Sequence, residues 1–129
     1  MKLIITLSAL LATSGAAQAL DCSAPQTQQD MNQCAYQMWQ YADEDLNLAY
    51  QMARDFMRTT DSYLPENLKG AEAALRDAQR AWIPFRDNAC AAEGFAFRGG
   101  SMEPLMVLSC KERLTRQRTE ELRSLSEMN

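Results

Sequence analysis

Residues 79–90, which read QRAWIPFRDNAC, concentrate the side chains of this chain that could do chemistry. A cysteine can act as a nucleophile, and an arginine near an aspartate can hold an anion or form a buried ion pair. The chain has no histidine, so it lacks the imidazole that most often serves as a base near neutral pH. It also has no glycine-rich phosphate loop and no serine nucleophile motif. We therefore expect no enzyme activity, no catalytic residue and no cofactor.

The densest acidic run of the chain is Asp43-Glu44-Asp45. Adjacent residues of a helix point in different directions, so these three carboxylates do not converge on one cation. We interpret the run as a solvated helix face rather than as a cation site, and we expect no metal site.

Residues 1–19 have the pattern of a cleavable signal peptide. Lys2 gives a short positive start, residues 3–12 are mostly apolar, and AQA at residues 17–19 is a small-x-small cleavage pattern. The apolar run is about half the length that spans a bilayer, so we expect no stable membrane anchor. The sequence therefore predicts a periplasmic or secreted protein.

Residues 20–129 are short enough to form one domain. They carry 12 Lys and Arg against 17 Asp and Glu, because Lys2 precedes them, and their net charge is −5. An acidic surface argues against nucleic acid and anionic membranes as partners. It favours a basic protein partner, although a mild negative charge also serves solubility alone.

All four cysteines lie within residues 20–129, namely Cys22, Cys34, Cys90 and Cys110. An even count in a small exported chain predicts two disulfides. A zinc site made of four thiolates is the alternative, but no pair has the two-to-four-residue spacing that such sites favour. Three pairings are possible. We favour Cys22–Cys34 and Cys90–Cys110, because each closes a short connection onto a neighbouring helix and contributes about 3 kcal/mol.

Three amphipathic stretches predict three helices. Apolar residues recur every three or four positions along residues 28–60, from residue 65 to about 93, and from residue 101 to about 126. No segment alternates between apolar and polar residues as a half-buried strand would. The predicted fold class is therefore all-α, a small three-helix bundle-like domain stapled by two disulfides.

The ends of these helices carry recognisable signals. Thr27 followed by Asp30 predicts a variant of the capping box at the start of the first helix. Pro65 suits the first turn of the second helix, and Ser101 can cap the third. Pro84 removes one backbone hydrogen bond inside the second helix, so we expect a kink there that aims the loop beyond it.

Polar residues on the apolar helix faces indicate either a core network or a ligand pocket. Asn47 lies in mid-helix, where asparagine is a poor helix former, and Arg118 lies on the apolar stripe of the third helix. A buried arginine needs a carboxylate partner, for which the candidates are Asp43, Asp77 and Asp87. We favour a structural network that links the helices, because buried polar groups commonly satisfy one another.

The opening stretch fits the same structural interpretation. Trp82 and Phe85 are expected on the apolar face of the second helix, with Trp82 packed against the first. Arg86 lies one turn after Trp82, and Cys90 one turn after Arg86, so the three form one ridge with Gln79 slightly offset. A ridge that ends in a disulfide indicates architecture rather than an exposed active site.

Residues 93–104, which read EGFAFRGGSMEP, have the composition of a binding loop. They hold three of the five glycines of the chain. Phe95, Phe97 and Arg98 are residue types that are enriched in binding hot spots, so we predict that this loop binds a partner. The alternative is that one or both phenylalanines fold back over the helix ends.

The order of these motifs resembles the LprI-like family of bacterial lysozyme inhibitors. The resemblance is carried by DCSAPQTQQDMNQCA, ADEDLNLAY, AQRAWIPFRDNAC, a glycine-containing loop and CKERLTRQRTEEL, in that order. The matching positions are Cys22, Cys34, Asp43, Leu46, Asn47, Tyr50, Gln79, Trp82, Arg86, Cys90, Gly100, Cys110, Arg118 and Leu122. Pro84 departs from the pattern, which favours an ordinary helical residue there.

The resemblance implies an exported helical domain that inhibits a muramidase by protein–protein binding. An acidic inhibitor would be steered to the basic surface of a lysozyme. The loop could then bring Arg98 to the two acidic groups of the catalytic cleft. The alternative function is a periplasmic helical interaction module whose partner is a non-lysozyme protein of the envelope or of a secretion system.

Overall fold

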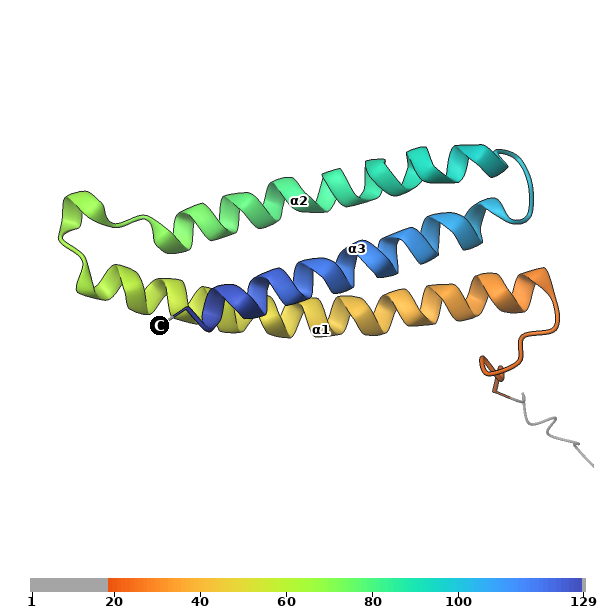
Figure 1. The fold of residues 1–129 in the computed structure, drawn as a ribbon, viewed down its shortest axis with the longest axis horizontal. Coiled ribbons are helices and arrows are strands. Elements are labelled where there is room, and N and C mark those ends of the chain that lie inside the picture. The colour runs from red at the N-terminus through yellow and green to blue at the C-terminus, as the bar shows by residue number, and fades with distance from the viewer. Residues whose placement is uncertain (1–18, 129) are drawn as a thin grey trace, which may run out of the picture.

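The computed structural model describes residues 19–128 and contains three long helices joined by short turns (Figure 1). The elements are α1 (Gln28–Tyr63), η1 (Glu66–Leu68), α2 (Ala71–Gly94), η2 (Phe95–Phe97) and α3 (Glu103–Ser126), where η marks a 3₁₀ turn. No strand occurs among the described residues, so the predicted all-α three-helix fold is confirmed. The predicted signal peptide lies, except for its last residue, outside the described residues. Between residues 19 and 128 no helix is both long and apolar enough to cross a membrane.

The three helices lie side by side in an elongated bundle (Figure 1). α3 packs most extensively on α1, whereas α2 contacts α3 more than it contacts α1. Small residues on α1 allow α3 to approach closely, because Ala42, Ala49 and Ala53 are fully or almost fully buried. The core is completed by Leu46, Leu75 and Leu122. Its apolar burial is the main favourable contribution to folding.

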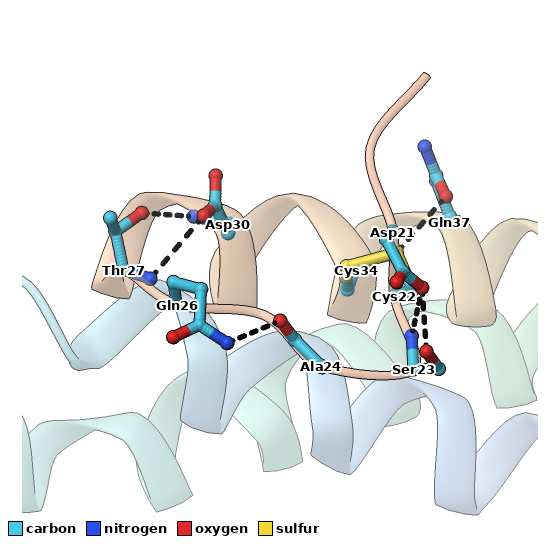
Figure 2. Close-up of a disulfide and its surroundings, with 9 residues drawn as sticks. All are labelled: Asp21, Cys22, Ser23, Ala24, Gln26, Thr27, Asp30, Cys34 and Gln37. Carbon is cyan, nitrogen blue, oxygen red and sulfur yellow. Dashed lines mark hydrogen bonds between the residues drawn. A yellow bond between two sulfur atoms is a disulfide. The ribbon is translucent and has the colours of Figure 1, made fainter. Parts of the chain in front are cut away.

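The start of α1 is fixed by a capping box and by a disulfide, which lie close together (Figure 2). The Thr27 hydroxyl accepts a hydrogen bond from the Asp30 amide at 3.0 Å, and the Asp30 carboxylate accepts one from the Thr27 amide at 3.3 Å. Cys22 is bonded to Cys34 on the next turn of the helix. Both the capping box and this disulfide were predicted, and both are confirmed.

The second disulfide joins Cys90 near the end of α2 to Cys110 on α3, with the two Cα atoms 5.4 Å apart. Both residues are buried, in contrast to Cys22, which is exposed. The prediction of local pairing is confirmed. This disulfide ties together the two helices that flank the predicted binding loop.

Two helix starts differ from the prediction. Pro65 precedes the 3₁₀ turn η1 rather than α2, which begins at Ala71. Ser101 does not cap α3; the N-cap is Met102, which makes no side-chain hydrogen bond there. The 3₁₀ turn η1 separates Pro65 from α2, and α3 begins one residue later than a cap at Ser101 requires.

α2 continues through Pro84 without interruption, and Figure 1 shows no sharp bend in it. Pro84 and Arg80, whose carbonyl loses its usual donor, are both exposed, so water can solvate that carbonyl. The structure therefore does not support the expectation that a kink at Pro84 directs the loop that follows α2. Phe85 was expected on the apolar face, and this was wrong, because its side chain is 62% exposed.

The N-terminus of α2 is capped by a residue of the preceding helix. The Asp61 carboxylate accepts hydrogen bonds from the backbone amides of Gly70, Ala71 and Glu72 at 2.9, 2.9 and 3.1 Å. Gly70 has φ +141°, a conformation that a side chain would strain. These three amide hydrogen bonds, that of Gly70 first, lower the pKa of Asp61.

We expect Asp61→Ala to lower the thermal midpoint at pH 7 and to lower it less at pH 3. The pKa of Asp61 is lowered in the folded state, so its contribution is present above the unfolded pKa, near 3.8, and is lost as the pH falls through the folded pKa. Thermal denaturation of both proteins from pH 7 to pH 3 measures the difference. Asp55→Ala is the matched control, because Asp55 is exposed and makes one surface ion pair. A midpoint difference that does not shrink on acidification would contradict the assignment.

Candidate functional site

The predicted binding loop lies at the junction of α2 and α3 and exposes its aromatic side chains. Phe95 is 60% exposed and Phe97 36% exposed, and both belong to η2. The Arg98 guanidinium lies 4.7 Å from the centre of the Phe95 ring, within the range of a cation–π contact. The structure thus places Phe95, Phe97 and Arg98 together on the surface, and neither phenylalanine is buried under the helix ends.

Glu103, the first residue of α3, holds the backbone and the arginine of this loop. Its carboxylate accepts hydrogen bonds from Arg98 Nη1 at 2.7 Å and from the Gly99 amide at 2.8 Å. The Gly99 amide and then the Arg98 guanidinium lower the pKa of Glu103, so its carboxylate stays charged near neutral pH. The loop is therefore largely preorganised, which reduces the entropy lost on binding.

Two glycines explain why the chain can turn here. Gly99 has φ +79°, which favours glycine. Gly94 is buried at the end of α2, and a Cβ atom at this position would lie 2.5 Å from Val107 Cγ2 of α3. Gly94 thus permits the close approach of α2 and α3, and Gly99 reverses the chain.

A second cluster lies inside the bundle around Arg86, which is only 7% exposed. Its guanidinium lies 5.4 Å from the Trp39 ring centre and 5.2 Å from the Trp82 ring centre. Its Nε donates to Asp87 at 2.9 Å, and its Nη1 lies 3.4 Å from Asp43. This side chain therefore connects α1 and α2 through two aromatic rings and two carboxylates.

α3 contributes two further groups to this cluster. The hydroxyl of Thr115, which is fully buried, lies 3.5 Å from Arg86 Nη1. Lys111 Nζ lies 4.7 Å from the Trp39 ring centre and 3.5 Å from the Asp87 carboxylate. Arg86 and Lys111 face Asp43 and Asp87, so the cluster has balanced charge and the buried Arg86 guanidinium has the carboxylate partners that it requires.

Arg118 has a different partner from those expected. Its Nε donates to Gln79 Oε1 at 3.0 Å, and its Nη1 donates to Glu121 at 2.9 Å. The candidates Asp43 and Asp87 pair with Arg86 instead, so the expected carboxylate partner of Arg118 was wrong. The contact still links α2 to α3.

Asn47 and Tyr50, the remaining members of the predicted polar motif, lie nearer the surface than Arg86. Asn47 is exposed and Tyr50 is half-buried on α1. Together with Asp43, Gln79 and Arg86 they border an open hollow between α1 and α2. The residues of the motif therefore divide into a buried cluster and the lining of a surface groove.

Sequence reasoning missed Trp39, which forms one side of the Arg86 cluster. Its position one helical turn before Asp43 was the available signal, because residues four apart on a helix are neighbours. No group of three or more His, Cys, Asp or Glu residues among the described residues could hold a metal ion. The arrangement offers binding surfaces and internal crosslinks.

These features define a small, disulfide-crosslinked helical domain with an exposed aromatic loop. The family described as "Lysozyme inhibitor LprI" matches residues 21–122, and the chain belongs to this family. That family is named for inhibitors rather than for enzymes. The match spans both disulfides, the Arg86 cluster and the loop.

Two proteins are similar to this chain over most of its length. An uncharacterized protein of Rhizobium meliloti (strain 1021) is 46% identical over 110 residues, which cover 83% of this chain and 79% of that protein. The crystal structure of a DUF1311 family protein from Pseudomonas putida KT2440 is similar, with a TM-score of 0.68 and 27% identity. That similarity covers 81% of this chain and 98% of the other.

Proposed function

We propose that this protein is an exported inhibitor of a lysozyme-type muramidase and that it acts by protein–protein binding. The match of residues 21–122 to the lysozyme inhibitor family LprI carries the proposal. The net charge of −5 after residue 19 supports it, because a basic lysozyme would be drawn to an acidic surface.

The loop at Phe95–Arg98 is the proposed contact surface. It presents two exposed aromatic rings and an arginine whose side chain is 65% exposed. Arg98 Nη1 donates to Glu103, and the other N–H groups of Arg98 remain available to donate to a carboxylate of the muramidase cleft. A preorganised loop of this kind can enter a cleft without first having to be ordered.

We expect micromolar amounts of the purified protein to slow the clearing of a peptidoglycan suspension by a c-type lysozyme. We expect Phe97→Ala and Arg98→Ala each to raise the inhibition constant about 30-fold, the size of a binding hot spot. Turbidity measured over a series of inhibitor concentrations gives the constant.

Phe85→Ala and Arg113→Ala are the matched controls. Phe85 is as exposed as Phe95 but lies about 15 Å away along α2, and Arg113 is an exposed arginine of α3 paired with Glu93. We expect both controls to inhibit like the native protein. Absence of inhibition at micromolar excess sinks the proposal for that lysozyme. Equal inhibition by all four variants would support the inhibitory function but would show that the loop is not the contact surface.

The alternative remains an interaction module with a non-lysozyme partner of the envelope or of a secretion system. A pull-down from envelope extract, compared side by side with a lysozyme column, distinguishes the two. Retention on the lysozyme column that Phe97→Ala abolishes favours inhibition. Failure to bind lysozyme, together with one reproducible envelope partner, favours the alternative.

A further inference from the structure

The hollow between α1 and α2 is a second surface, distinct from the loop. We call it the α1–α2 groove; its volume is about 570 Å³, which is in the range of ligand sites. Its lining consists of Asp43, Leu46, Asn47, Tyr50, Arg54, Glu72, Arg76, Gln79, Arg80, Ile83 and Arg86. α1 and α2 make fewer contacts with each other than either makes with α3, and this leaves the groove open between them.

The lining of the groove has more arginines than carboxylates although the chain is acidic. Four arginines line it against two carboxylates, in a chain whose overall charge is negative. Arg54 pairs with Glu72, and Arg76 pairs with Asp77. Arg80 is exposed and forms no ion pair with any residue between 19 and 128. Concentration of one sign of charge in a concave surface attracts ligands of the opposite sign.

Arg86 supplies a buried and fixed donor at one end of the groove. Its Nε and Nη1 are engaged by Asp87, Asp43 and Thr115, but its Nη2 makes no hydrogen bond within residues 19–128. Trp39 and Trp82 hold the guanidinium plane in place. A donor that is already immobilised loses little entropy when it binds a carboxylate.

The shape of the groove favours an extended chain over a compact ion. Its lining on α1 runs from Asp43 to Arg54, about 16 Å at the rise of an α-helix. An extended peptide of about five residues has that length. Tyr50, which is half-buried, and Ile83, which is exposed, add apolar surface between the charged positions. Arginines spaced along such a groove match carboxylates spaced along a peptide.

We propose that the α1–α2 groove binds an extended peptide segment that bears several carboxylates. Arg80 and Arg76 contact it along α2, and Arg86 receives one carboxylate at the end of the groove. This site lies outside the Phe95–Arg98 loop, so a single molecule can hold an acidic peptide and a basic protein at once.

Fluorescence anisotropy with fluorescein-labelled pentaglutamate tests the proposal. We expect saturable binding at low salt that weakens as the ionic strength rises, because exposed charges are screened. We expect Arg80→Glu to weaken the binding about tenfold or more, the effect of one charge-assisted hydrogen bond. Pentalysine and citrate are the comparison ligands, and neither is expected to match pentaglutamate.

Arg113→Glu is the matched control, because it reverses the same charge on an exposed arginine outside the groove. We expect its dissociation constant for pentaglutamate to lie within about twofold of the native value. We expect both variants to have the thermal midpoint of the native protein, since exposed substitutions change stability little. Lysozyme inhibition by Arg80→Glu is expected to be unchanged, which separates this site from the proposed inhibitory loop. The proposal is overturned if pentaglutamate does not bind, if Arg113→Glu weakens it as much as Arg80→Glu, or if citrate binds as tightly.

Discussion

We expect Arg86→Ala to lower the free energy of unfolding by about 3 kcal/mol. Its side chain is 7% exposed and fills the space between Trp39 and Trp82, so truncation leaves a cavity and removes two cation–π contacts. Asp43 and Asp87 lose their partner, but they are 42% and 43% exposed, and water can solvate them. The cost therefore stays at the low end of the 3–5 kcal/mol typical of a broken, fully buried pair.

Urea denaturation of the oxidised protein, followed by circular dichroism, measures this change. Arg86→Lys keeps the charge but loses the planar guanidinium, so we expect about half the effect. Arg116→Ala is the matched control on α3, where the side chain is half-exposed, and we expect a change within about 0.5 kcal/mol. If the free energy of unfolding of Arg86→Ala lies within about 1 kcal/mol of the native value, the stacked arginine contributes little to stability and the cluster is not a structural crosslink.

The helical period was sufficient to predict much of this architecture. Arg86 and Cys90 are buried, as the ridge in α2 required, and Trp82 packs against the core. Spacing predicts these positions because residues three or four apart share one face of a helix. The disulfides followed from the even number of cysteines and their short local loops.

The period did not place every side chain of α2 correctly. Phe85 and Arg86 are adjacent, and both were expected on the side of α2 that faces the other helices. The structure buries only Arg86, because two tryptophans and two carboxylates surround it and satisfy its charge, whereas Phe85 is exposed. Trp39 lies on another helix, and no pattern within α2 points to it.

The sequence also could not predict which side chains pair across helices. Arg118 was expected to pair with a carboxylate of another helix, yet it bonds to the neutral amide of Gln79 and to Glu121 on its own helix. Asn47 was grouped with the core polar residues, although it is exposed in the groove. Which face of α1 remains uncovered depends on how α2 packs, and that is not encoded in the local period.

Removal of the Cys90–Cys110 disulfide is the second change for which we expect a large loss of stability. We expect the double variant Cys90→Ala/Cys110→Ala to lose about 3 kcal/mol of unfolding free energy, because the bond closes a sequence separation of 20 residues in the unfolded chain. Both sulfur-bearing side chains are buried, so their truncation also removes packing between α2 and α3.

Cys22→Ala/Cys34→Ala is the matched control for that variant. Chain entropy alone predicts nearly the same loss, because its sequence separation is 12 residues. Cys22, however, is exposed and lies in a segment before α1 that is mostly exposed, so this segment can detach without unfolding the bundle. We therefore expect the urea midpoint to fall clearly further for Cys90→Ala/Cys110→Ala than for the control. Equal shifts in the two variants would mean that each disulfide acts only through the unfolded chain and that the buried position of Cys90 and Cys110 adds nothing.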